Sequence, residues 1–453
     1  MSSGIRNEIT ETKRYLRKQL LATIFNQFDG KLMGLSDEDR GNKYRKMSKD
    51  PYSFFRGSAY LFYYDVTGLP FTFHTPENKP TWLLGDLHFD NISAFQNEKK
   101  EVVFDVDDFD EGYFGSYLYD VLRMVVSIRL MSSQHGYTGD DTEEFVESFL
   151  NDYIGQLQRF YSGEEDPVQL QFTKANTSGP IQNVLHNLEE KWTSTEVESS
   201  AAQFDSIKTA IDDDNLVDLS HQEKEEFLRV WEDYIESISS NIKKHPQFYA
   251  VKDVMKKAGA GIGSTGLERY YIMIAGEGHS NIILEAKEAR TPIPAYFFPY
   301  DETFWKENQH QGRRVVHTQQ AMHHKADPYL GYLTFNGHDF YVRERSLFTN
   351  ELRDDDLQEF DSMVDTVKTM AKITAKIHAR ADVDIEDGLM DHHSEEAILH
   401  EIESNRTRFI QQLMVWSAYY QKVVEADFQL FNEWISETPK LQDKTNKKPI
   451  RSQ

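Results

Sequence analysis

Carboxylate and amide side chains cluster in two short stretches that each follow an apolar segment. In GDLHFDN (85–91), Asp86 precedes Asn91 by five positions. Asp108 and Asp110 lie in VVFDVDDFDEG, and Asp108 comes seventeen residues after Asn91. Oxygen ligands of this kind suit Mg²⁺ or Mn²⁺ rather than zinc. A carboxylate can also orient a hydroxyl group or accept its proton. These residues could therefore hold magnesium beside a reacting hydroxyl; the alternative is that they are turn residues and strand caps.

A second candidate set lies more than 150 residues downstream. Gly261, Gly263 and Gly266 form a G-x-G-x-x-G that includes Ser264, and Lys287 ends the apolar run IILEAK. Glycines let backbone N–H groups approach phosphate oxygens. A dinucleotide-binding site needs a helix after the glycines, but LERYYIMI is typical of a strand. The pattern favours the phosphate-covering loop and the nucleotide-binding lysine of kinases; an ordinary hairpin and a surface lysine are the alternative.

Helices and short strands must position both sets. Apolar or alternating runs predict strands immediately before each acidic stretch, and the run at 117–131 predicts a helix that is buried nearly all round. The predicted strand-rich segments are 81–84, 101–106, 258–290 and 329–345. The predicted helical segments are 11–28, 50–65, 117–131, most of 141–245, and 361–434.

Composition limits the class of protein. The chain has 453 residues, of which 39% are hydrophobic and none is cysteine. Cysteine-ligated metals, disulfides and thiol nucleophiles are therefore excluded. The net charge of −25 argues against binding to nucleic acid or to an anionic membrane. No apolar run approaches the ~18 residues of a membrane span, and MSSGIRNEITETKRYLRKQL has no signal-peptide core. We expect a cytoplasmic protein without nucleic-acid or membrane partners.

The motifs resemble those of known families. GDLHFDN is similar to the catalytic loop G-D-x-H-x-x-N of aminoglycoside phosphotransferases and choline kinases. Over about residues 50–435 the chain is identified as a member of the bacterial family called "domain of unknown function 2252", whose members look kinase-like. The stretches that carry the resemblance include SFFRGSAYLFYYD, LLGDLHFDN, VFDVDDFDEG, GIGSTGLERYYIMI, LEAKEA, QGRRVVHTQQAM, FYVRER and AKITAKIHARAD.

The order of the motifs is inverted relative to an ordinary kinase, in which the glycine loop and lysine precede the catalytic loop. The resemblance therefore implies an α+β, two-lobed protein-kinase-like fold that is circularly permuted and carries a helical insertion. Permutation is tolerated where the chain ends lie at the surface. The implied segments are an N-terminal extension (1–50), a catalytic and metal-binding part (51–140), a helical insertion (141–245), a nucleotide-binding lobe (246–345), a helical remainder (346–435) and a polar tail (436–453).

The resemblance also implies roles for the acidic residues. Asp86 would be the catalytic base or would orient the acceptor hydroxyl, with His88 as a second candidate that braces the loop. Asn91 and Asp108 would bind magnesium. Asp110 would be a second ligand, ahead of the neighbouring aspartates 105 and 107.

The same resemblance assigns the nucleotide. Lys287 would hold the α- and β-phosphates of ATP, and Gly261, Gly263, Ser264 and Gly266 would cover the triphosphate. From the helix that follows the acidic stretches, Asp120 would brace the catalytic loop.

An acidic partner for Lys287 is missing from the expected helix, which has His317 and Gln319 instead of a glutamate. Glu288 is adjacent to Lys287 and should point to the opposite face of the strand. The histidines of HHK (323–325) and DHH (391–393) lack the spacing of a helical zinc pair and are interpreted as solvated polar residues.

Three functions follow from these observations. The first is an ATP- and Mg²⁺-dependent (or Mn²⁺-dependent) phosphotransferase that acts on the hydroxyl of an unknown small molecule or protein. The second keeps the fold but transfers AMP to a protein hydroxyl. The third is a pseudoenzyme that binds nucleotide without turnover.

Overall fold

The computed structural model describes residues 2–97, 99–199, 206–211, 215–239, 242–258, 265–276, 281–323, 327–345, 350–385 and 389–441. It is a mixed α+β structure that divides into two compact units. Unit 1 consists of Met1–Gly68, Gly259–Leu267 and Trp416–Gln453. Unit 2 consists of Leu69–Ala258 and Glu268–Val415. Within the described ranges, no helix is both long enough and apolar enough to cross a membrane.

Unit 1 is helical. The predicted helix at 50–65 forms as two helices, and the first has Pro51 at its N-terminus and an Asp50 cap that accepts from Ser53 N at 2.7 Å. In α1, Arg17 forms ion pairs of 2.6 Å with both Asp65 and Asp427, which join three helices of the unit. The helices are α1 (Ser2–Phe25), a π-helical segment (Asn26–Leu32), α2 (Asp37–Met47), α3 (Pro51–Gly57), α4 (Ala59–Val66) and the later part of α14 (Arg406–Ser436).

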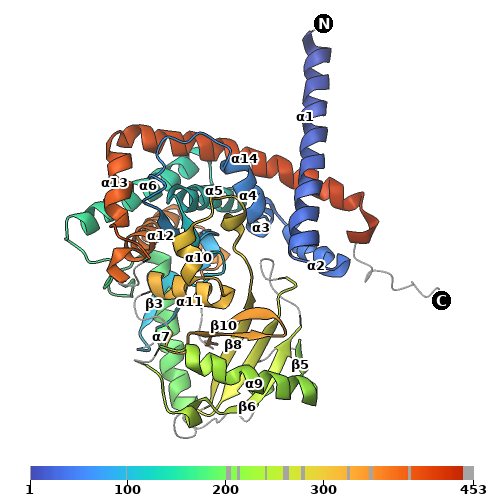
Figure 1. Ribbon diagram of the computed structural model, residues 1–453. Coiled ribbons are helices and arrows are strands. Elements are labelled where there is room, and N and C mark those ends of the chain that lie inside the picture. Colours follow the sequence, from blue (N-terminus) through green and yellow to red (C-terminus); the bar gives the residue numbers. More distant parts are fainter. Residues whose placement is uncertain are drawn as a thin grey trace, which may run out of the picture. The chain divides into compact units, whose positions relative to one another are not determined.

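Unit 2 contains a six-stranded antiparallel sheet with the order β5-β6-β7-β8-β10-β9 (Figure 1). Its strands are β5 (Leu216–Asp218), β6 (Val251–Lys257), β7 (Arg269–Ile274), β8 (Ile282–Ala289), β9 (Gly331–Phe335) and β10 (His338–Glu344). Helix α9 (His221–Ser237) covers one face, because its Phe227, Trp231 and Tyr234 pack with strand residues such as Ile272 and Leu284. Side chains alternate along a strand, so Glu285 and Lys287 lie on the other face.

One hairpin and one further antiparallel pair of strands carry the acidic stretches. β1 (Thr81–Leu83) pairs with β4 (Tyr113–Gly115), and β2 (Ile92–Gln96) pairs with β3 (Val102–Val106). The predicted strands at 81–84 and 101–106 are confirmed as β1 and β3. β5 was not predicted, because three residues at a sheet edge are too few to show an alternating pattern.

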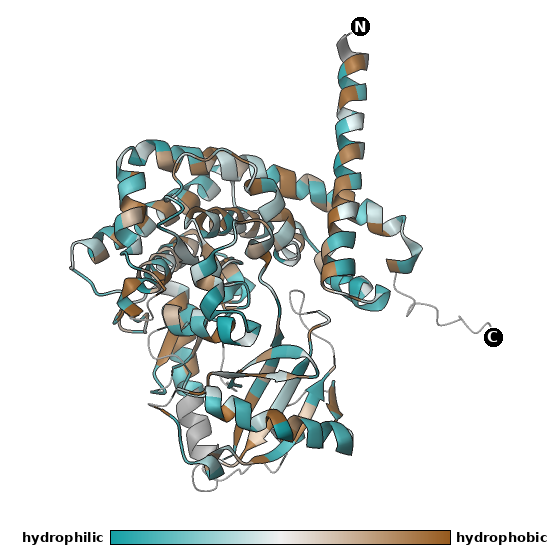
Figure 2. Ribbon diagram, viewed as in Figure 1, coloured by the Kyte–Doolittle hydropathy of each residue, from teal (hydrophilic) through white to brown (hydrophobic). Residues whose placement is uncertain are grey.

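Unit 2 also contains further helices. The predicted buried helix is confirmed as α5, and Figure 2 shows hydrophobic residues along most of its length. The helices are α5 (Leu118–Gln134), α6 (Gly139–Tyr161), α7 (Gly179–Ser199), α8 (Ile207–Ala210), α10 (Glu302–Glu307), α11 (Gln311–Met322), α12 (Phe360–Arg380) and α13 (Ser394–Glu403). Short 3₁₀ segments are Phe89–Asn91, Pro246–Tyr249, Ile293–Tyr296, Asp354–Leu357 and Val383–Ile385, with Pro439–Leu441 in unit 1. Residues 442–453 of the predicted polar tail lie outside the described residues.

Candidate functional site

Helix α5 anchors the GDLHFDN loop, which connects β1 to β2. The backbone N–H groups of Leu84 and Gly85 donate to the two carboxylate oxygens of Asp120, at 2.7 and 3.1 Å. Phe89 N donates to Ser127 Oγ at 2.8 Å. Asp120 and Ser127 are seven residues apart, so they lie on the same side of the helix two turns from each other. The prediction that Asp120 braces this loop is therefore confirmed.

The carboxylate of Asp86 lies at the tip of the loop and is 23% exposed. Its Oδ1 accepts from Nε of Arg123, at 2.5 Å, and this arginine of α5 is fully buried. Asn91 Nδ2 donates to the backbone oxygen of Asp86 at 2.6 Å, which closes the loop. His88 is buried, with Nε2 3.9 Å from Asp86 Oδ2. The loop therefore holds Asp86 in one orientation while leaving it accessible.

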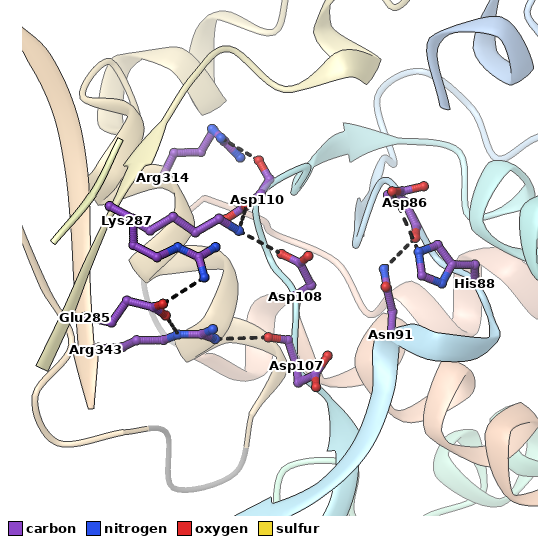
Figure 3. Close-up of polar contacts among 11 residues, drawn as sticks. Asp86, His88, Asn91, Asp107, Asp108, Asp110, Glu285, Lys287, Arg314 and Arg343 are labelled. Atoms are coloured by element: carbon purple, nitrogen blue, oxygen red, sulfur yellow. Dashed lines mark hydrogen bonds and ion pairs between the residues drawn. The ribbon is translucent and has the colours of Figure 1, made fainter. Parts of the chain in front are cut away.

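The β2–β3 hairpin brings the two acidic stretches together. Its register pairs Ile92 with Val106, so Asn91 and Asp107 are neighbours at the open end of the hairpin. Asp107 N donates to Asn91 O at 3.0 Å. Asp108 follows directly, and Figure 3 shows its carboxylate between Asn91 and the sheet.

Lys287 of β8 meets the acidic residues of the DFD segment (108–110). Its Nζ contacts Asp110 Oδ2 and lies 3.8 Å from Asp108 Oδ1 (Figure 3). Burial alone would lower the pKa of Lys287, but the charges of Asp108 and Asp110 outweigh it and raise that pKa. The half-exposed carboxyl of Asp108 loses part of its hydration, which opposes ionisation, yet Lys287 and Arg343 hold the pKa of this carboxyl below its usual value. Lys287 and Asp108 are therefore both charged.

Arg314 of α11 supports the backbone of the DFD segment. Its guanidinium is fully buried and donates to the backbone oxygens of Asp110, Gly112 and Arg290, at 2.7, 3.0 and 2.9 Å. Backbone oxygens of two chain segments thus converge on one cation. The arginine therefore ties the DFD segment to the end of β8.

A buried ionic network lies next to Lys287 on the same face of the sheet. Glu285 Oε1 is 3.0 Å from Arg269, and its Oε2 is 3.2 Å from Arg343. Burial would raise the pKa of Glu285, but Arg343 and Arg269 outweigh it and lower that pKa to about 2. Arg343 also donates to Asp107 O at 3.1 Å. The network thus extends from β8 to the DFD segment.

Helix α12 supports the site from a third direction. Lys376 forms a buried ion pair with Asp105 of β3. His378, also buried, lies between Tyr153 Oη at 2.8 Å and Asp120 Oδ2 at 3.4 Å. Asp105, the less favoured candidate metal ligand, is therefore already paired with a lysine.

The structure brings together six of the predicted site residues: Asp86, His88, Asn91, Asp108, Asp110 and Lys287 all belong to unit 2. Gly261, Gly263 and Ser264 lie outside the described residues. Gly266 belongs to unit 1, has φ +78° and lies against Leu35, whose Cδ2 would be 2.2 Å from an added Cβ. The role of the glycine loop stays a prediction.

The unplaced partner of Lys287 is supplied by the DFD segment rather than by a helix. Glu288 points away, as predicted, since it contacts Arg290 at 2.7 Å and His338 at 3.0 Å. His317 of α11 lies beside Arg313 instead, 3.3 Å from its Nε.

Sequence reasoning missed the arginines, since no spacing rule links them to the acids they contact. His323 also differs from the prediction of a solvated residue. It is buried, its Nε2 donates to Val106 O at 2.6 Å, and its ring lies against the rings of Phe95 and Phe109.

The comparisons with known proteins identify the family. A family model described as "Uncharacterized protein conserved in bacteria (DUF2252)" matches residues 39–434. The chain belongs to this family. No curated protein and no solved structure matches it. The family description names no activity, so the chemistry has to be argued from the site itself.

Proposed function

We propose that the protein is an ATP- and Mg²⁺-dependent phosphotransferase on a circularly permuted kinase-like fold, which transfers the γ-phosphoryl group to a hydroxyl acceptor. One observation carries the proposal. Lys287 contacts Asp110 although the two are 177 residues apart in the chain. In kinases, a strand lysine that binds phosphates and a carboxylate that binds magnesium share one site.

The order of elements in the sheet supports the kinase-like interpretation. The glycine-rich segment joins β6 to β7, Lys287 lies on the next strand, and α11 follows before β9 and β10. Protein kinases have a glycine-rich loop, a lysine on the third strand and then the helix αC. The GDLHFDN loop precedes this lobe in the chain instead of following it, as a circular permutation requires.

The residues of unit 2 fit a magnesium ion. Asp110 Oδ1 is buried and has no hydrogen-bond partner within the described part of the chain. The side chain of Asp108 is half exposed. Asn91 donates through Nδ2 and therefore has its Oδ1 to offer. All three atoms are hard oxygen ligands. These residues would hold the ion, whose positive charge would offset the negative charge of the phosphates.

The chain's own groups would handle the acceptor and the phosphates. Asp86 would accept a hydrogen bond from the acceptor hydroxyl and take its proton, because its carboxylate is accessible and held by Arg123. Lys287 would exchange its contact with Asp110 for a phosphate oxygen, which frees that carboxylate for the metal. Fixed donors of this kind stabilise charge that develops during transfer.

A second candidate, adenylyl transfer, is favoured by the Glu285 network. In the kinase motif V-A-I-K, the residue two positions before the lysine is a small alanine. Here that position is Glu285, paired with Arg269 and Arg343. Charged groups suit phosphates better than an adenine ring. ATP bound in a flipped pose, with its terminal phosphates on these arginines, would expose the α-phosphate and yield pyrophosphate.

The decisive experiment is isothermal titration of ATP into the purified protein, with Mg²⁺ and with chelator. Lys287→Ala and Asp108→Ala should each lose magnesium-dependent binding. Lys252→Ala, at an exposed position of β6, is the matched control and should retain it. Binding that persists in both site variants would refute the proposal.

Product analysis then separates the candidates. ADP released with a hydroxyl acceptor supports phosphoryl transfer, and pyrophosphate supports adenylyl transfer. Either activity should be lost in Asp86→Ala. Tight binding of ATP with neither product across a wide acceptor screen would favour the non-catalytic alternative.

A further inference from the structure

A second cluster of metal-ligating side chains lies where α12 gives way to α13. Asp382, Asp384 and His393 each offer one ligand atom, and these atoms lie within 4.8 Å of one another. Asp382 is buried, with 1% of its surface exposed. The side chains of Asp384 and His393 are 29% and 49% exposed. The cluster therefore has a buried floor and an open side. It shares no residue with the site around Lys287.

Glu395, in the first turn of α13, provides an independent observation at the same place. The residue is only 7% exposed, and its Oε2 has no hydrogen-bond partner in the described ranges. Its Oε1 lies 3.7 Å from His393 Nδ1. A buried carboxylate oxygen without a donor is costly unless a proton or a cation compensates it.

Capping of α13 explains part of this arrangement but not all of it. Asp382 accepts from Ser394 N at 2.7 Å and from Asp384 N at 3.0 Å, which is a structural role at a helix start. Glu395 takes no part in these backbone bonds, but its carboxyl forms a side-chain hydrogen bond with Asp382. Adjacent carboxylates of this kind either hold a proton or bind a cation.

We propose that Asp382, Asp384, His393 and Glu395 form a binding site for a divalent transition-metal ion, of the Mn²⁺ or Zn²⁺ class. One imidazole nitrogen with three carboxylates is a mixed nitrogen and oxygen ligand set. Imidazole favours a transition metal over Mg²⁺ or Ca²⁺, which prefer oxygen ligands alone.

A metal ion at this site would connect two helices. The ion would join the end of α12 to the start of α13. Helix α12 also carries Lys376 and His378, which contact Asp105 and Asp120 beside the candidate phosphotransferase site. The metal would therefore stabilise the helix that supports that site, without taking part in its chemistry.

The test is a titration of Mn²⁺, followed by electron paramagnetic resonance, into the full-length protein carrying Asp108→Ala. This background removes a ligand of the other candidate metal site. We expect one tight equivalent of Mn²⁺ per chain, which Zn²⁺ displaces and Mg²⁺ displaces only at tenfold or higher concentration. The melting temperature should rise with Mn²⁺.

The substitutions use the two partly exposed ligands, which are the least needed for folding. In the same background, Asp384→Asn and His393→Gln should each weaken Mn²⁺ binding at least tenfold. Asp391→Asn, in the same loop and fully exposed, is the control and should leave the affinity unchanged. Circular dichroism confirms that each variant is folded. Equal affinity in the parent and in the two ligand variants would overturn the proposal, as would Mg²⁺ binding as tightly as Mn²⁺.

Discussion

Replacing Asp120 with asparagine should loosen the GDLHFDN loop more than any neutral change on the same helix. The carboxylate is fully buried and accepts from Leu84 N and Gly85 N with separate oxygens, at 2.7 and 3.1 Å. Asparagine keeps one acceptor oxygen and turns an NH₂ group towards the other backbone N–H. The variant therefore loses one charge-assisted hydrogen bond and leaves a buried donor facing another donor.

The cost follows from these two contacts. A hydrogen bond to a charged group contributes about 1.5–3 kcal/mol, and an unsatisfied buried donor costs about 1–3 kcal/mol. Asp120→Asn should thus lower the free energy of unfolding by roughly 2.5–6 kcal/mol. Ser127→Ala is the matched control, since Ser127 accepts only one backbone N–H of the same loop, from Phe89 at 2.8 Å, through a neutral hydroxyl. Its cost should be about 1–2 kcal/mol.

Urea unfolding followed by far-ultraviolet circular dichroism measures both variants against the wild type. The affinity for ATP with Mg²⁺, measured by calorimetry, reports whether the loop is displaced. The reasoning is refuted if Asp120→Asn destabilises the protein no more than Ser127→Ala does.

Three other changes test individual contacts. Gly85→Ala should destabilise the protein by about 2 kcal/mol or more in thermal unfolding, because Gly85 has φ +86° and an added Cβ would lie 2.1 Å from Glu111 O. Lys376→Met should cost about 3–5 kcal/mol by stranding the buried Asp105, and adding Asp105→Leu should recover most of that loss in urea unfolding. Burial lowers the pKa of His323 to about 4 in the folded protein, whereas its unfolded pKa is about 6.5. The neutral, buried imidazole therefore stabilises the fold fully above the unfolded pKa, and this contribution is lost as the pH falls towards 4. The wild type should lose about 2 kcal/mol between pH 7 and 5, and His323→Gln should lack that pH dependence; an unchanged pH profile would contradict it.

Local patterns predicted the elements that carry the site. The apolar runs before Asp86 and Asp108 form β1 and β3, and the helix that bears Asp120 forms as expected. Hydrophobic periodicity is a property of neighbouring residues, so it can be read along the chain. The acidic residues at the ends of these short strands indicated one shared site.

The ionic partners of these acids could not be predicted in the same way. Arg314 contacts the backbone oxygen of Asp110 from 204 residues away, and Arg343 contacts that of Asp107, just before the DFD segment, from 236 residues away. No periodicity connects such distant positions, and an arginine on a strand or helix is equally compatible with a solvated side chain. The search for a glutamate partner of Lys287 failed for a related reason. Helix α11 contributes Arg314 to the segment, and the acids that contact Lys287 come from another part of the chain.

Buried ion pairs contribute little to the stability of a fold, so several of them in one place call for another explanation. Removing two charges from water costs several kcal/mol per ion, and well-packed hydrophobic residues often serve stability equally well. Yet Lys287 with Asp110, Lys376 with Asp105, and Arg343 with Glu285 all bury charge beside the same hairpin and sheet face. Stability alone does not explain three such pairs in one place. The proposed binding of phosphates and a cation would explain them, because such a site needs preorganised charges that exchange one partner for another when the ligand arrives.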